Sequence, residues 1–457
     1  MIHCDLLRAL FLTLLFVSTQ AFANYSVPEL ETLTHEIISR QKPYSNLREL
    51  DQIGPRVSGS ENASKAIQWG KKKMESYGFD RVTLEPCMVP KWSRGNHESA
   101  TVLLSDHKKL PLSVAALGGS IGTQGVEASV IEVSSLADVE KLGDQVRGKI
   151  VFYNQAMDIL HQDSFKAYSA IGSLRTKGAA QASKFGAVAT VVRSLSTLPD
   201  DDHPHTGIMD YDPKYPKIPS AALSTHAANI LSQKLKDDPS LKLRLELSAS
   251  DTTEVQSNNV VGEITGSQFP KEVFLVGGHL DSWDLGRGDH DDGAGVVQSL
   301  EVVRAMKALK LKTKRTIRVV LFMTEEFGGI GAEQYERRLL KSDEKIIGGL
   351  ESDRGGFAPT GFSVHSKSEV LKKIEGWKSD LALVNASDLI PMQHGGTDTE
   401  VLGDAGIPEF ELIPISTHYF DFHHSALDQL SVVNPKDLTL GAAAMAVFSY
   451  LVAENGI

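Results

Sequence analysis

The fold is decided by residues 273–282, which have the sequence VFLVGGHLDS. The apolar run 273–276 predicts a short buried strand, and the glycines and polar residues after it predict where that strand ends. Residues 293–309 predict a helix, because their apolar residues fall on one side of a helical repeat. The nearly continuous apolar run 317–323 predicts a second strand, covered on both faces. This order of strand, helix and strand is typical of a parallel sheet with helices packed on it.

Further along the chain the alternation continues. Residues 346–350 and 410–413 predict two more strands, and residues 438–452 predict a closing helix. Alternating strands and helices indicate an α/β fold, with a mostly parallel sheet flanked by helices.

Three parts of the chain differ in their patterns. Residues 1–23 have a short polar start, an apolar run and an Ala-Phe-Ala end, which is typical of a secretory signal peptide. Residues 24–119 and 253–457 form the main α/β domain in this interpretation. Between them, residues 120–252 predict a smaller inserted α/β domain, with a helix over 168–185 and a polar loop.

The overall composition excludes several classes of protein. The 457 residues include 47 basic and 58 acidic residues, with a net charge of −11, and 41% of them are hydrophobic. The acidic balance argues against nucleic-acid binding, which needs clustered Lys and Arg. After the signal peptide we find no stretch of the roughly 18 apolar residues that a membrane span needs. We therefore expect a secreted or periplasmic protein, or a lysosomal or extracellular one in a eukaryote.

The chain has two cysteines, and they predict no intramolecular disulfide. Cys4 leaves with the signal peptide, so Cys87 stands alone in the mature chain. No patterned histidine lies near Cys87, and we interpret it as a structural thiol.

Five short segments are rich in side chains that bind metal ions, and most of them follow a predicted strand. They are residues 277–282, 289–295, 324–328, 351–353 and 422–425. In an open α/β sheet, groups at the carboxyl ends of the strands meet in one crevice. Carboxylates and imidazoles without a thiolate favour zinc.

Taken alone, each of these residues has a simpler explanation. Asp292, for example, could cap the helix that follows it. The adjacent pair Glu325 and Glu326 is harder to explain, because two acids after an apolar strand repel each other unless a cation or a function offsets that cost. A two-zinc site would suit amide hydrolysis, since two ions about 3.5–4 Å apart can activate water and polarise a carbonyl. A further carboxylate must then carry the proton to the leaving amine.

The same segments, in this order, resemble the co-catalytic zinc exopeptidases related to aminopeptidase Y and carboxypeptidase Q. The resemblance is strongest to the carboxypeptidase Q branch, through GHLDSWD at residues 278–284 and DDG at 291–293. The Gly-Pro-Arg turn at 54–56 is also similar to that family. Residues 120–252 resemble its protease-associated domain.

The resemblance implies two zinc ions and a role for each matched residue. The implied ligands are His279 and Asp353 for one zinc ion, Glu326 and His424 for the other, and Asp291 as the bridge between them. Glu325 would be the general base and acid, and Asp281 would orient the His279 imidazole. In such sites the peptide bond between Asp291 and Asp292 is often cis.

Two assignments within the resemblance have alternatives. His423 is adjacent to His424, and His424 is preferred because a hydroxyl residue follows it directly. His290 is interpreted as a neighbour of the ligand Asp291. A loop with His394, Thr397 and Asp398 resembles a substrate-binding loop of the family, although a glycine turn with a capping Asp explains it as well.

We therefore expect a di-zinc metallopeptidase that hydrolyses short peptides, in particular dipeptides with free ends, and that forms a homodimer as members of that branch often do. The alternatives are an aminopeptidase on longer peptides, a receptor relative without metals, and a one-zinc glutaminyl cyclase. The receptor and the cyclase would each lack ligands, whereas His279 and Asp353 are both present.

Overall fold

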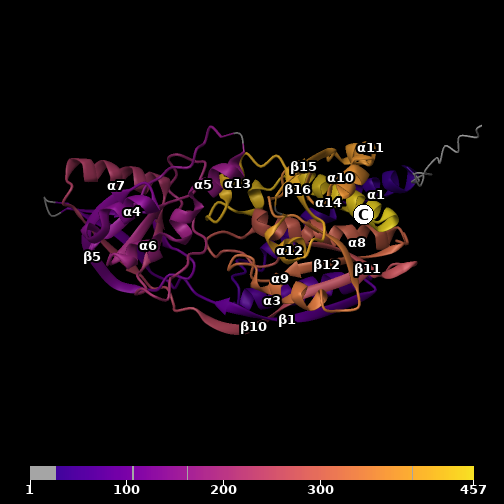
Figure 1. The fold of residues 1–457 in the computed structure, drawn as a ribbon, viewed down its shortest axis with the longest axis horizontal. Coiled ribbons are helices and arrows are strands. Elements are labelled where there is room, and N and C mark those ends of the chain that lie inside the picture. The colour runs from indigo at the N-terminus through magenta and orange to yellow at the C-terminus, as the bar shows by residue number, and fades with distance from the viewer. Residues whose placement is uncertain (1–26, 105–107, 162, 394) are drawn as a thin grey trace, which may run out of the picture.

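The computed structural model describes residues 27–104, 108–161, 163–393 and 395–457. The predicted signal peptide and His394 therefore lie outside the described residues. Two eight-stranded sheets form two units that lie end to end (Figure 1). The result is a mixed α/β fold, as the strand and helix patterns predict.

The first sheet holds the predicted strands near its centre. Its order is β1 (Arg81–Lys91), β10 (Thr253–Ile264), β12 (Arg315–Phe322), β11 (Phe269–His279), β13 (Lys345–Glu351), β16 (Glu409–Pro414), β14 (Pro359–His365) and β15 (Asp388–Pro391). The four central strands β12, β11, β13 and β16 run parallel. Antiparallel pairings extend the sheet on both sides, through β10 next to β12 and β14 next to β16. The prediction of parallel strands is therefore correct for the centre of the sheet.

Helices cover both faces of this sheet. They are α1 (Val27–Arg40), α2 (Lys42–Asp51), α3 (Glu61–Ser76), α8 (Ala294–Ala308), α9 (Ile330–Leu339), α10 (Ser368–Glu375), α11 (Lys378–Leu381), α12 (Glu400–Asp404) and α14 (Pro435–Asn455), whereas α13 (Tyr419–Phe422) packs against the second unit. Successive strand residues point to opposite faces. Val260 and Leu321 belong to the core shared with α1, α2, α3, α8 and α14, whereas Val261 and Val320 belong to a smaller core under α9. Both faces are thus buried, which explains the continuous apolar runs.

Helix α14 is long and apolar enough to cross a membrane by length and composition, which the sequence analysis did not expect of any segment after the signal peptide. In the structure 83% of its most apolar window is buried inside the protein. It packs against α8 and α1 in the core of the first unit. A helix surrounded by protein is apolar on all sides, so burial accounts for its composition.

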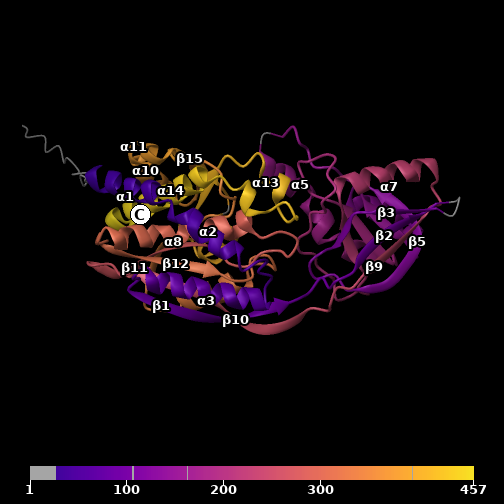
Figure 2. The ribbon, with the colours of Figure 1, turned by 180° about the vertical axis from the view of Figure 1, so that it is seen from behind.

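The second sheet belongs to residues 98–247, and its elements are β2 (Glu98–Leu103), β3 (Lys109–Leu112), β4 (Val114–Ala116), β5 (Thr123–Val133), α4 (Leu136–Leu142), β6 (Ile150–Tyr153), α5 (Ser164–Thr176), α6 (Gly178–Lys184), β7 (Ala189–Arg193), β8 (Ser220–Leu223), α7 (Thr225–Asp237) and β9 (Lys242–Leu247). The sheet therefore begins before residue 120, because β2 pairs with β9. Figure 2 shows β1 and β10 running along the base of the first unit toward this second unit.

The helix predicted over 168–185 is two helices, α5 and α6. The chain bends at Lys177, and Gly178 then lies against the ring of Tyr153, whose hydroxyl donates a hydrogen bond to the Gly178 carbonyl at 2.9 Å. A side chain at position 178 would lie only 2.8 Å from that ring. The close contact, which the local sequence does not reveal, explains the interruption.

Cys87 lies in β1 and is buried, with 3% of its surface exposed. Burial raises the pKa of its thiol to about 11. A thiol that is buried and protonated at neutral pH is inert, in agreement with the interpretation as a structural residue.

Candidate metal centre

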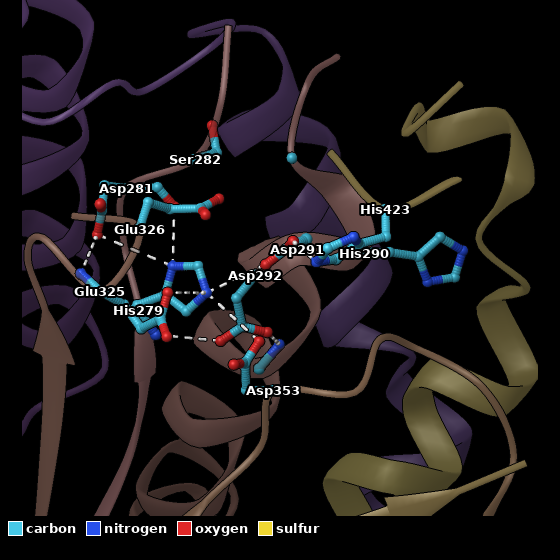
Figure 3. Close-up of polar contacts among 12 residues, drawn as sticks. His279, Asp281, Ser282, His290, Asp291, Asp292, Glu325, Glu326, Asp353 and His423 are labelled. Carbon is cyan, nitrogen blue, oxygen red and sulfur yellow. Dashed lines mark hydrogen bonds and ion pairs between the residues drawn. The ribbon is translucent and has the colours of Figure 1, made fainter. Parts of the chain in front are cut away.

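The predicted metal-binding side chains meet at the carboxyl ends of the central parallel strands. His279 is the last residue of β11, Glu325 and Glu326 follow β12, and Asp353 follows β13. In the parallel register His279 lies opposite Phe322, the last residue of β12. These three strand ends therefore place imidazole and carboxylate groups around one point, with the loop of Asp291 on the other side (Figure 3).

Asp291 joins two groups of side chains. Its Oδ1 lies 3.1 Å from His279 Nε2, and its Oδ2 lies 3.2 Å from His424 Nε2. Asp353 Oδ1 completes the first group, at 3.3 Å from His279 Nε2. Glu326 Oε2 completes the second, at 3.0 Å from His424 Nε2. This is the pairing of residues that the resemblance implies, with Asp291 between the two groups.

The same centre contains carboxylate oxygens that lack a hydrogen-bond donor. Among the described residues, buried oxygens of Asp281, Asp291, Glu326 and Asp353 have no such partner. Buried acceptors without donors are costly unless a cation compensates them. A set of imidazole nitrogens and carboxylate oxygens, gathered in overlapping groups whose ligand atoms lie within 4.8 Å of one another, fits a divalent ion such as zinc.

The crowding of charges alters the protonation of these groups. Burial raises the pKa of Glu326 to about 7, although His424 opposes this effect. Burial lowers the pKa of His279, but the carboxylates of Asp353 and Asp291 outweigh it and raise that pKa well above its usual value. The centre thus combines desolvation with strong coupling between opposite charges, as functional sites often do.

His423 and His424 are distinguished by their contacts. His423 Nε2 lies 3.7 Å from Asp291 Oδ2, farther than His424 Nε2, and His424 also contacts Glu326. The His423 ring stacks on the His424 ring, with 3.5 Å between centroids, and also packs against the aromatic rings of Tyr168, Tyr419 and Phe420. Both histidines lie with Asp291 in one group that could hold a metal ion, so the choice of His424 stays a prediction, which its contact with Glu326 supports.

His290 stacks between the rings of Phe357 and Phe422 and accepts a hydrogen bond from Gly356 N at its Nδ1. Burial lowers its pKa to about 4. It is therefore a neutral neighbour of the centre, as expected.

Asp281 organises the turn that carries Glu325. Its Oδ1 accepts hydrogen bonds from the backbone N–H groups of Thr324 at 2.6 Å and Glu325 at 3.2 Å. Thr324 has a φ of 81°, and its hydroxyl contacts Ser58 Oγ at 2.8 Å. His279 Nδ1 donates a hydrogen bond to the backbone carbonyl of Asp281 at 3.1 Å. The carboxylate oxygen Oδ1 of Asp281 lies farther from Nδ1, at 3.8 Å. Asp281 thus contacts both the imidazole and the predicted general base.

The peptide bond between Asp291 and Asp292 is cis, as the resemblance implies. Asp292 Oδ2 accepts a hydrogen bond from His279 N at 3.0 Å, and its Oδ1 accepts one from Gly295 N at 2.8 Å. Asp292 thus caps the start of α8 while it ties that helix to β11. A side chain at Gly278 would lie 2.5 Å from Asp292 Oδ2, so the glycine makes room for this contact.

Asp428 is a residue that the sequence analysis missed. Its carboxylate accepts three backbone hydrogen bonds, from Asp289 and His290 at Oδ1 and from Asp291 at Oδ2. These bonds fix the loop that carries Asp291. An acid four residues after His424 is the signal that could have suggested a role.

Arg56 is the residue that gives the Gly-Pro-Arg turn its function. Its side chain is fully buried, and it donates hydrogen bonds to the carbonyls of Leu280 at 2.8 Å, Arg287 at 2.7 Å and Gly288 at 2.8 Å. Its backbone N–H also donates to Ser282 Oγ at 3.0 Å. One guanidinium therefore holds together the two loops that carry His279 and Asp291.

The second unit reaches the centre through residues 205–208. The Thr206 carbonyl accepts a hydrogen bond from His424 Nδ1 at 3.3 Å, and Thr206 N donates to the His424 carbonyl at 3.0 Å. A hydrogen bond at Nδ1 leaves His424 Nε2 facing Glu326 and Asp291. The second unit thus orients one of the predicted ligands.

A cavity of about 260 Å³ lies between the two units, beside the centre. Glu325, Asp353 and Thr397 line it, together with aromatic side chains from both units. Asp398, predicted with Thr397 to bind substrate, is fully buried, and its backbone N–H donates to Glu351 Oε2 at 3.0 Å.

Comparison with known proteins gives a consistent result. Residues 259–449 match peptidase family M28. The chain is 37% identical to human carboxypeptidase Q over 422 residues, which is 91% of this chain and 86% of that protein. Among solved structures, a peptidase M28 precursor from Shewanella amazonensis is 33% identical, covers 94% of this chain and 97% of its own, and superposes with a TM-score of 0.90. A zinc aminopeptidase from Bacillus subtilis, at 18% identity, covers 90% of this chain and 95% of its own with a TM-score of 0.65, so it shares the fold.

Proposed function

The chain belongs to peptidase family M28, and from that premise we propose that it hydrolyses dipeptides with free ends by means of two zinc ions. It is a zinc-dependent exopeptidase, in keeping with the carboxypeptidase Q relatives and the shared zinc aminopeptidase fold. The observation that carries the proposal is the position of Asp291 between two groups of ligands, each completed by one histidine and one further carboxylate.

The proposed ligands are His279 and Asp353 for one ion, Glu326 and His424 for the other, and Asp291 for both. A bound zinc ion supplies Lewis-acid chemistry: it polarises a carbonyl and makes water a stronger acid. The count of two ions is supported by the two groups on either side of Asp291, each with at least one buried oxygen that has no hydrogen-bond donor among the described residues.

Glu325 is the proposed general base and acid. Its side chain is 18% exposed and lines the cavity, so it can reach a water molecule and a leaving amine there. Burial raises the pKa of this carboxyl well above its usual value, which makes it a better proton acceptor. Asp281 positions it by holding the backbone N–H of Glu325.

The signal-peptide pattern of residues 1–23 supports a secreted or periplasmic location, or a lysosomal or extracellular one in a eukaryote. The second sheet of residues 98–247, with an apolar core of its own, supports an inserted protease-associated domain. A homodimer is proposed from the resemblance to the carboxypeptidase Q branch, and sedimentation of the purified protein would test it.

The experiment that tests the function measures zinc per chain and hydrolysis together. The substrates would be free dipeptides, N-blocked dipeptides and amino-acid amides, each with and without a chelator. We expect two zinc ions and chelator-sensitive cleavage of the free dipeptides. Cleavage of amides alone would indicate an aminopeptidase, and a chain without metal or turnover would refute the proposal.

Variants of the two adjacent histidines provide a matched control for the ligands. His424→Ala should lower the zinc content much more than His423→Ala, because His424 contacts both Glu326 and Asp291 whereas His423 lies farther from Asp291. His279→Ala should also lose zinc. A full complement of zinc in either the His279 or the His424 variant would reject that residue as a ligand.

A further inference from the structure

One cationic side chain from the second unit lines the cavity beside the metal centre. The cavity receives Phe165, Tyr168, Arg175 and Ile208 from that unit. From the first unit it receives carboxylates, including the general base Glu325. Among the described residues that line it, Arg175 is the one Arg or Lys.

The Arg175 guanidinium is buried and has no counter-ion in the described part of the chain. Its exposed fraction is 7%, and its Nη1 donates a hydrogen bond to the Thr206 carbonyl at 3.1 Å. Its Nε is fully buried and, among the described residues, has no hydrogen-bond partner. Burying a charge without an anion is costly. The unused donor and the missing anion both indicate a ligand with a negative charge.

Arg175 lies directly beside the metal ligand His424. Gly207 separates the two: a side chain at this glycine would begin 2.6 Å from Arg175 Nη1 and 2.7 Å from His424 Nδ1. Both groups also share the Thr206 carbonyl as acceptor. The guanidinium is therefore next to the reacting centre, on the side formed by the second unit.

Arg175 and His424 line the same cavity and lie on either side of Gly207, an arrangement that suits a short substrate. A peptide bond cleaved beside His424 and Glu326 is followed by the residue on its C-terminal side, and one extended residue spans about 3.3–3.6 Å. If that residue is the last of the peptide, its carboxylate lies in the cavity that Arg175 lines, where the guanidinium can bind it. A guanidinium binds a carboxylate with two parallel hydrogen bonds, and that pairing is directional as well as strong.

We propose that Arg175 binds the free C-terminal carboxylate of the substrate and so restricts cleavage to peptides that end one residue after the scissile bond. The inference rests on the proposed function and deepens it, since it names the group by which dipeptides are preferred to longer peptides and amides. Arg175 acts on specificity and takes no part in the proton transfers.

The test compares a dipeptide with its C-terminal amide, using the zinc-loaded protein and its Arg175→Gln variant. For the free dipeptide we expect kcat/KM to fall by about 10- to 100-fold in the variant, the usual effect of losing charged hydrogen bonds. For the amide, which has no carboxylate to bind, kcat/KM should change much less. The ratio of the two values is the readout, because general damage to the centre would lower both values equally.

Arg193→Gln is the matched control. Arg193 is a buried arginine of the same unit, paired with Asn229 and the Pro199 carbonyl away from the cavity, and its loss should leave the ratio unchanged. Equal losses for both substrates in Arg175→Gln, or an unchanged ratio, would overturn the assignment. A wild-type protein that prefers the amide would overturn it as well.

A binding measurement separates this inference from the proposed function. Calorimetry would use the free amino acid that forms the C-terminal half of the dipeptide, and the amide of that amino acid. The wild-type protein should bind the free amino acid more tightly than its amide, and Arg175→Gln should lose that preference. Selective binding of the acid without turnover of any dipeptide would refute the proposed function while it supports Arg175 as a carboxylate site. Turnover of dipeptides with no preference for the acid would refute Arg175 alone.

Discussion

The carboxylate of Asp428 accepts a hydrogen bond from the backbone N–H of His290 at 2.8 Å, and with two further bonds it fixes the loop that carries Asp291, the proposed bridging ligand. Asp428 contributes no atom to the proposed metal ligands. It acts through the backbone, and the position of Asp291 depends on it.

Asp428→Asn should therefore weaken zinc binding. An amide offers one acceptor oxygen where the carboxylate uses two, and its NH₂ group faces backbone donors. Loss of such an outer contact typically lowers metal affinity about 10- to 100-fold. Competition with a chelator of known zinc affinity measures the change. Asp144→Asn, whose side chain is 83% exposed, is the control, and zinc affinity equal in both variants would refute the role of Asp428.

Arg56→Lys should destabilise the fold and the metal centre together. One ammonium cannot reach the three carbonyls that the Arg56 guanidinium satisfies, and each buried acceptor left without a donor costs about 1–3 kcal/mol. We expect a loss of roughly 3 kcal/mol in the free energy of unfolding and reduced zinc content. Denaturant titration and metal analysis measure both. Arg48→Lys, on the exposed side of α2, should show neither effect, and an Arg56 variant as stable as wild type would contradict the proposed role.

Glu325→Gln should keep both zinc ions and lose several orders of magnitude in kcat. The amide has nearly the same shape as the carboxylate but cannot accept the proton, so the chemical step alone is affected. Glu333→Gln, at an exposed position of the nearby helix α9, is the matched control. Turnover near the wild-type value in the Glu325 variant would remove this residue from the mechanism.

The sequence could predict a gathering of metal-binding side chains because three of the proposed ligands follow strand ends. His279, Glu326 and Asp353 each follow an apolar run. Parallel strands bring such positions together regardless of the conformation of the loops. Asp428, Thr206 and Arg175 could not be assigned in this way. Their roles depend on how a loop folds back or how the second unit packs, and neither leaves a local pattern. The early start of the second sheet was missed for the same reason, because β2 is defined by its pairing with the distant strand β9.

Glu336 should make the stability of the protein depend on pH. Its side chain lies on α9, is fully buried, and faces Asp398 and Glu409. Burial, followed by the effect of these two acids, raises the pKa of Glu336 from the usual 4.5 to about 9. Between these values the unfolded chain has released the proton while the folded chain still holds it. Stability must therefore fall as the pH rises from about 5 to 9, since the folded state binds more protons.

Glu336→Gln should remove that part of the pH dependence. The variant should be about 2 kcal/mol more stable than wild type at pH 8. Removing the titration stabilises the folded variant by more than this, but burying an amide that lacks partners offsets part of the gain. Near pH 5 the titration costs the wild type less than about 1 kcal/mol, so the same offset should make the variant about 2 kcal/mol less stable than wild type. Denaturant unfolding at several pH values, at equal zinc saturation, measures the difference, with Glu333→Gln as the exposed control. A gap between variant and wild type that stays constant from pH 5 to 9 would mean that Glu336 is ionised in the folded protein, with its charge compensated by a cation or a donor inside the acidic cluster.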